Sequence, residues 1–149
     1  MKRQRGVNKF EFAIVVSIFG VLAFVFLARM ERVQGDAERT EVQLTIRHMR
    51  VGMQLAVGEL IMHGEEHRMA ELAAINPVRF LEKKPPGYEG EATSPSRRGG
   101  WVFDPLRKEI AYRPRLPQAF DGRDELRWRY QSVAFAADRL GGLRLVAVE

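Results

Sequence analysis

The feature that most constrains this chain is an uncharged apolar run near its N-terminus. From Phe12 to Ala28 the sequence reads FAIVVSIFGVLAFVFLA. As a helix this run would be about 26 Å long, at roughly 1.5 Å per residue, and Phe10 extends it toward the ~30 Å apolar core of a bilayer. The run therefore predicts a membrane-spanning helix, which leaves the remaining chain to fold as a domain attached to an anchor.

The residues before the run are basic. Lys2, Arg3 and Arg5 precede Gly6, and this excess of positive charge predicts a cytoplasmic N-terminus and a C-terminal domain on the periplasmic side. The apolar run exceeds the ~7 to 15 residues usual for a cleaved secretory signal, and no small-x-small site ends it. We therefore expect it to stay attached. The chain has no cysteine, so neither a lipoprotein anchor nor a disulfide is expected.

A single carboxylate, Glu11, stands at the start of the apolar run, five residues after Gly6. A charged group deep in a bilayer costs about 2.5 to 3.5 kcal/mol on insertion scales. Cleavage after Gly6 would create an α-amino group at Val7, and an amine and a carboxylate offset each other's desolvation when they pair. The alternative is an uncleaved anchor with Glu11 at the level of the lipid headgroups.

The basic leader, Gly6, Glu11 and the apolar run together resemble the N-terminus of the type IV pilin-like family, which includes pilins, minor pilins and the pseudopilins of type II secretion. The resemblance covers roughly the first 30 residues. It implies that a prepilin peptidase cuts between Gly6 and Val7, that Val7 is N-methylated, and that Glu11 guides subunit assembly. Val7, where Phe or Met is usual, and Lys9 depart from the family pattern.

The same resemblance implies partners and a location. The expected partners are the prepilin peptidase, other pilin or pseudopilin subunits, an inner-membrane assembly platform and the lipid bilayer. The expected location is the bacterial inner membrane, crossed once, with the C-terminal domain in the periplasm and with incorporation into a pilus or pseudopilus. No cofactor and no enzymatic activity are expected, because the chain has neither a nucleophile–base signature nor a phosphate-binding glycine loop.

Beyond the apolar run, the pattern is that of an amphipathic helix. We predict one continuous helix from about Val7 to His63, ended by Gly64 as a C-terminal cap. A short helix over 65–74 and a turn opened by Asn76 and Pro77 should follow. The apolar positions assigned to the helix face are Val33, Ala37, Leu44, Met49, Met53, Ala56, Val57 and Leu60.

The C-terminal part is rich in strand patterns. Residues 101–103 and 110–112 predict a hairpin, 126–131 alternate apolar with polar residues, and 142–148 supply a last strand. We therefore predict an α+β, pilin-like fold with a long N-terminal helix packed on a small antiparallel sheet of about four strands. The expected segments are a leader (1–6), a transmembrane part (7–28), an amphipathic helical region (29–82), a loop (83–100) and a sheet lobe (101–149).

Residues 97–149 are mildly basic, and four arginines in this lobe are candidate contacts for nucleic acid or another partner: Arg113, Arg115, Arg127 and Arg129. With Trp128 and Tyr130 they would form a basic and aromatic strip of the kind that binds single strands. We favour the simpler reading, a solvated sheet face, so nucleic acid is not an expected partner.

Two groups superficially suggest metal ligands. His63 and His67 flank a helix end, where Gly64 disrupts the facing geometry of a ligand pair. Asp121, Asp124 and Glu125 follow no recognised calcium-loop spacing. We predict no metal site from either group.

The sequence thus predicts a minor pilin or pseudopilin that assembles through its N-terminal helix. One alternative is a pilin-like module that binds DNA or another ligand through its arginine-rich sheet. The other is an uncleaved single-pass membrane protein with a periplasmic domain.

Overall fold

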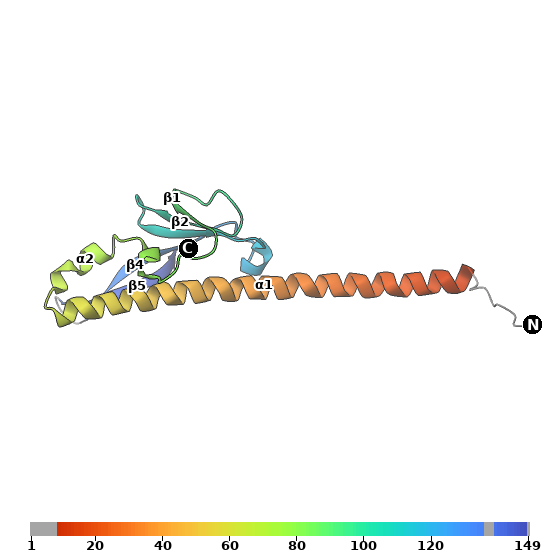
Figure 1. Cartoon of the computed structure of the whole chain (residues 1–149), viewed down its shortest axis with the longest axis horizontal. Helices are drawn as coiled ribbons and strands as arrows, with labels where there is room; N and C mark the ends of the chain where they lie inside the picture. The colour runs from red at the N-terminus through yellow and green to blue at the C-terminus, as the bar shows by residue number, and fades with distance from the viewer. Residues whose placement is uncertain (1–8, 136–138, 149) are drawn as a thin grey trace, which may run out of the picture. The chain divides into compact units, whose positions relative to one another are not determined.

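A computed structural model describes residues 9–135 and 139–148. These residues form an α+β fold with one long helix, short helical turns and a five-stranded sheet (Figure 1). They divide into two compact units, residues 1–37 and 38–149, with the boundary inside the long helix. The elements are α1 (Lys9–Met62), η1 (Glu66–Arg68), α2 (Met69–Leu72), η2 (Pro77–Phe80), β1 (Tyr88–Glu91), β2 (Gly100–Asp104), β3 (Glu109–Arg113), η3 (Pro117–Phe120), β4 (Leu126–Phe135) and β5 (Arg139–Val148).

The described part of the first unit is the N-terminal portion of α1. Its large apolar side chains are exposed all around the helix, with exposed fractions between 43% at Met30 and 75% at Phe10. A helix that is apolar on every side is suited to an apolar surrounding rather than to water. The Ser17 hydroxyl donates a hydrogen bond to the carbonyl oxygen of Ala13 at 2.8 Å, so its polar group is satisfied within the helix.

The end of α1 confirms the predicted glycine cap. Gly64 has a φ of 70°, a left-handed conformation that glycine adopts without strain. The Glu65 amide donates to the carbonyl oxygen of Leu60 at 2.9 Å, and the Gly64 amide donates to that of Ile61 at 3.1 Å. These two bonds form a Schellman motif, which satisfies carbonyl groups that would otherwise lack partners.

The strands lie in the order β1-β2-β3-β4-β5. All neighbours pair antiparallel except β1 and β2, which are parallel. The four predicted strands are present as β2 to β5 and pair antiparallel as expected, but the sheet has a fifth strand, β1, which makes it mixed. The additional strand, β1, lies within the segment 83–100 that was predicted as a loop. Its pattern, YEGE, carries no alternation of apolar and polar residues, so only pairing with β2 defines it.

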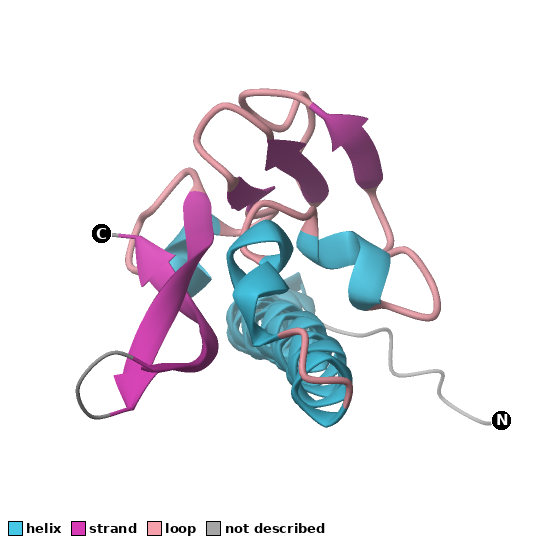
Figure 2. Cartoon of the chain, turned by 90° about the vertical axis from the view of Figure 1, so that its left-hand side faces the viewer, coloured by secondary structure: helices cyan, strands magenta, loops and turns pink. Residues whose placement is uncertain are grey.

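The main core lies between the second half of α1 and the sheet. Seen along α1, the strands occupy one side of this part of the helix (Figure 2). Trp101 is central, with its ring 4.5 Å from that of Tyr112 and 5.8 Å from that of Trp128. The buried residues of this cluster are Val42, Ile46, Met49, Val78, Trp101, Phe103, Ile110, Tyr112, Phe120 and Leu145.

The predicted apolar face of α1 was partly wrong. Met49, Met53 and Val57 are buried as expected, and Ile46 joins them. Leu44 and Val33, however, are 48% and 62% exposed, and Ala37 is exposed as well. The helix carries apolar residues on two faces, and steps of three and four residues can be drawn through either face. The sequence pattern alone did not separate them.

Candidate functional site

The N-terminal part of α1 is the first candidate site. Gly6 and Val7, the predicted cleavage and methylation positions, lie outside the described residues. Glu11 lies in the first turn of α1 and is exposed, between Phe10 and Phe12, which are exposed at 75% and 63%. No described residue donates a hydrogen bond to Glu11 or forms an ion pair with it.

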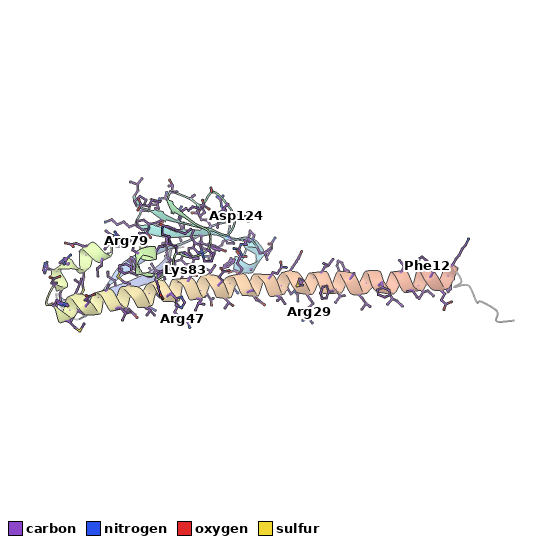
Figure 3. All side chains as sticks on the ribbon, in the orientation of Figure 1. Phe12, Arg29, Arg47, Arg79, Lys83 and Asp124 are labelled. Atoms are coloured by element: carbon purple, nitrogen blue, oxygen red, sulfur yellow. The ribbon has the colours of Figure 1, made fainter. Side chains whose placement is uncertain are left out.

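This arrangement suits an interaction with a cation from outside the described chain. A carboxylate in an apolar surrounding needs a partner, because its charge is otherwise desolvated without compensation. The described part of α1 contains a stretch long and apolar enough to cross a membrane, and none of that stretch is buried within the chain. Figure 3 shows side chains, including the labelled Phe12, projecting from this stretch of the helix.

A second carboxylate on α1, Glu38, is 5% exposed and was not predicted as a site. Its Oε1 accepts hydrogen bonds from the Tyr112 hydroxyl at 2.7 Å and the Arg115 amide at 2.6 Å, and its Oε2 accepts from the Leu116 amide at 3.1 Å. Burial, together with this carboxylate, raises the pKa of the Tyr112 hydroxyl. Glu38 thus joins α1 to β3 and the segment after it. No local pattern in the sequence predicted this role, because the donors lie 74 to 78 residues away along the chain.

The four candidate arginines do not act as one group. Arg127 contacts three carboxylates: Asp104 at 3.5 Å, Glu109 at 3.2 Å and Glu125 at 2.5 Å. Burial lowers the pKa of the Arg127 guanidinium, but the neighbouring carboxylates outweigh burial and raise it overall. A side chain held in this way is already satisfied within the chain.

The other three arginines have separate positions. Arg113 is half-buried, and its carbonyl oxygen accepts a bond from the Gly99 amide at 2.7 Å. Arg115 is exposed and contributes its amide to Glu38, while Arg129 is exposed on β4.

Trp128 and Tyr130 pack against the core, whereas Arg127 and Arg129 alternate with them along β4. Because alternate residues of a strand point to opposite faces, the structure does not interleave these rings and arginines on one surface.

The carboxylates considered for calcium each face a different arginine. Asp121 pairs with Arg39 at 3.9 Å, and Asp124 pairs with Arg98 at 3.5 Å. Among the described residues no three His, Asp or Glu side chains are grouped so that they could hold a metal ion. His63 directs its Nδ1 to the carbonyl oxygen of Glu59 at 2.8 Å, a contact within its own helix end.

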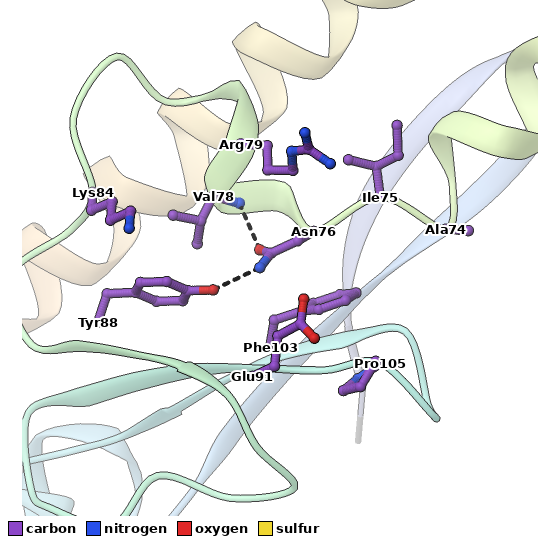
Figure 4. Close-up of a pocket in the computed structure, with 10 residues that line it drawn as sticks. All are labelled: Ala74, Ile75, Asn76, Val78, Arg79, Lys84, Tyr88, Glu91, Phe103 and Pro105. Atoms are coloured by element: carbon purple, nitrogen blue, oxygen red, sulfur yellow. Dashed lines mark hydrogen bonds between the residues drawn. The ribbon is translucent and has the colours of Figure 1, made fainter.

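An open cavity of about 530 Å³ lies beside η2 and β1 (Figure 4). Within it the Asn76 amide group donates to the Tyr88 hydroxyl at 2.6 Å and accepts from the Val78 amide at 3.0 Å, which confirms the predicted cap at Asn76. The Lys84 ammonium lies 5.9 Å from the centre of the Tyr88 ring. The lining residues are Ala74, Ile75, Asn76, Val78, Arg79, Lys84, Tyr88, Glu91, Phe103 and Pro105.

This cavity carries no arrangement of a nucleophile beside a base among its described lining residues. Its polar groups at Asn76 and Tyr88 instead fix the segment before β1 against the sheet. The N-terminal part of α1 therefore stands as the better candidate site. Comparison with protein-family models, with curated proteins and with solved structures gave no match to this chain.

Proposed function

We propose that this chain is a membrane-anchored minor pilin or pseudopilin subunit that assembles through its N-terminal helix. The observation that carries the proposal is the exposed Glu11 at the start of an apolar helical stretch of membrane-spanning length. The α+β domain built on the second half of the same helix is consistent with a pilin-like layout. The sequence Lys2 to Gly6 before it supplies the resemblance to a prepilin leader.

The proposed mechanism is electrostatic. After cleavage between Gly6 and Val7, the new α-amino group of one subunit pairs with Glu11 of its neighbour. Each charge offsets the desolvation of the other, and the pairing sets the axial register between subunits. The N-terminus lies on the cytoplasmic face of the inner membrane before assembly, and the domain lies in the periplasm.

The test is the intact mass of the membrane-extracted protein from strains with and without the prepilin peptidase. We expect loss of residues 1 to 6 and one added methyl group only where the peptidase is present. A Gly6→Val variant is the matched control, and it should keep the leader in both strains. An unchanged N-terminus of the unaltered protein in both strains would contradict the proposal and favour an uncleaved single-pass membrane protein.

A nucleic-acid-binding role has less support. Of the four candidate arginines, Arg127 is occupied by three carboxylates of its own chain, and the aromatic residues that would stack on bases pack into the core instead. We do not propose it as a second function.

A further inference from the structure

The second half of α1 has an exposed apolar face in addition to the face that packs on the sheet. Leu44, Val51, Leu55 and Met62 are exposed at 48%, 48%, 71% and 80%. They follow one another at steps of seven, four and seven residues. At roughly 100° per residue they share one direction, about 180° from the mean direction of the buried α1 residues of the core. We call these four residues the outer stripe.

Nothing in the described chain covers the outer stripe. Figure 2 shows the strands on the other side of this part of α1. Single exposed apolar residues are common on protein surfaces and need no explanation. A row of four on one helix face, at steps that match the helical period, is the pattern with which helices bind other helices.

The charges beside the outer stripe differ between its two flanks. Glu41 and Glu59 share one flank, and Arg47 lies on the other, on the side of α1 away from the sheet (Figure 3). None of these three exposed side chains forms an ion pair with a described residue. In a twofold pair of parallel helices, the acidic flank of one copy meets the basic flank of the other. In an antiparallel pair, the two acidic flanks would meet each other, and so would the two basic flanks.

Membrane anchoring also favours parallel rather than antiparallel packing. Copies inserted in one bilayer with the same topology carry their α1 helices parallel, so this step rests on the membrane anchoring in the proposed function. We propose that a second copy of this chain packs in parallel along the outer stripe. Leu44, Val51, Leu55 and Met62 form the apolar seam, and the flank of each copy that carries Arg47 lies beside the acidic flank of the other.

Because the chain contains no cysteine, a single introduced cysteine can test this contact without interference from other thiols. In a parallel twofold pair each stripe residue meets its own copy, within the ~7 Å between Cα atoms that a disulfide requires. Full-length Val51→Cys and Leu55→Cys proteins in isolated membranes should form disulfide-linked dimers under a mild oxidant. Gln43→Cys is the control, since Gln43 is exposed on the same helix but about 100° from the stripe.

The direction of packing is tested separately. Leu44→Cys and Met62→Cys should each also form dimers when expressed alone. Crosslinking no higher than that of the Gln43→Cys control would overturn the inference. So would crosslinking of Leu44→Cys only with Met62→Cys, because this result means antiparallel packing. Arg47→Glu in the Val51→Cys background should lower the dimer yield by about twofold to fivefold, and an unchanged yield would overturn the parallel charge matching.

Membrane flotation of the same samples separates this inference from the proposed function. Protein that floats with the membranes but crosslinks only at the control level overturns the pairing and leaves the proposed function standing. Protein that does not float overturns the membrane anchoring, while the crosslinking pattern still decides whether the outer stripe pairs.

Discussion

Two carboxylates on the same helix have opposite surroundings. Glu38 is 5% exposed and accepts hydrogen bonds from one hydroxyl and two backbone amides of its own chain. Glu11 is exposed among apolar side chains, and no described residue pairs with it. A buried charge that is satisfied within the chain serves the fold, because its loss leaves donors without partners. A charge left open in an apolar stretch is suited to a partner from outside.

The largest change in stability is expected from removing the buried carboxylate of Glu38. Glu38→Ala should lower the free energy of unfolding of the domain by about 3 to 5 kcal/mol, because it removes a buried acceptor of three hydrogen bonds. Glu11→Ala should change it by less than about 0.5 kcal/mol. Urea unfolding of the full-length proteins in detergent, followed by tryptophan fluorescence, measures both changes.

Subunit assembly, in contrast to stability, should depend more on Glu11 than on Glu38. Glu11→Ala should lower the co-purification of tagged with untagged subunits from membranes to the level that pairing through the outer stripe alone supports, because it removes the partner of the neighbour's amine. Tyr112→Phe is the control for the fold, since it removes one of the three bonds to Glu38 and should cost about 1.5 to 3 kcal/mol. A Glu38→Ala protein as stable as Tyr112→Phe would show that the two amide bonds contribute little.

The second prediction extends the comparison to two arginines of β4. Arg127→Met leaves Asp104 and Glu109, which are 1% and 6% exposed, without their shared cation. Removing one partner of a buried ion pair is strongly destabilising, and since Arg127 is partly exposed we expect about 2 to 4 kcal/mol. Arg129→Met, on the same strand but exposed, should change stability by less than about 0.5 kcal/mol. Equal effects in chemical denaturation would mean that the cluster around Arg127 is screened by solvent.

A third comparison concerns two glycines of α1. A Cβ atom at Gly52 would lie 2.4 Å from the carbonyl oxygen of Phe80, whereas a Cβ at Gly58 would meet no atom within 4 Å. Gly52→Ala should therefore destabilise the domain by about 1 to 3 kcal/mol, because η2 must move away from the helix. Gly58→Ala should stabilise it by about 0.5 to 1 kcal/mol through helix propensity. Thermal melts of both variants test the difference in sign, and a stabilising Gly52→Ala would show that η2 yields easily.

These comparisons also show which structural features could be predicted from the sequence. Local signals were sufficient where one or two residues decide the conformation. Gly64 ended the helix, Asn76 capped η2, and the alternation in residues 126–130 gave β4. The hairpin of β2 and β3 followed from two short apolar runs around a turn with a proline.

Long-range contacts defined the rest. Strand β1 has no pattern of its own, and it exists because its backbone pairs with β2. The role of Glu38 depends on donors that lie 74 to 78 residues away. The sequence places Arg127 on a solvated sheet face. It does not predict the ion pairs with Asp104 and Glu109, because these residues come beside Arg127 only when β2, β3 and β4 pair. Neither charge carried a signal in its neighbouring residues.

The smallest expected effect distinguishes two carboxylates of β1. Glu89 accepts hydrogen bonds from the Ser96 hydroxyl at 2.5 Å and the Ser96 amide at 2.9 Å, whereas Glu91 is exposed and has no described partner. These bonds, the hydroxyl first, hold the pKa of the Glu89 carboxyl below its usual range. Because the pKa is lower in the folded protein, this contribution to stability is present above the unfolded pKa. It is lost as the pH falls through the folded value.

Carboxyl carbon chemical shifts, followed from neutral to acidic pH in the full-length protein, measure this effect. In the unaltered chain Glu89 should stay ionised to a lower pH than an unstructured glutamate. Ser96→Ala should raise the Glu89 pKa, because it removes the hydroxyl donor, and Glu91→Gln is the matched control that should leave it unchanged. A Glu89 pKa that does not respond to Ser96→Ala would show that the loop after β1 is held by its backbone pairing with β2 rather than by this carboxylate.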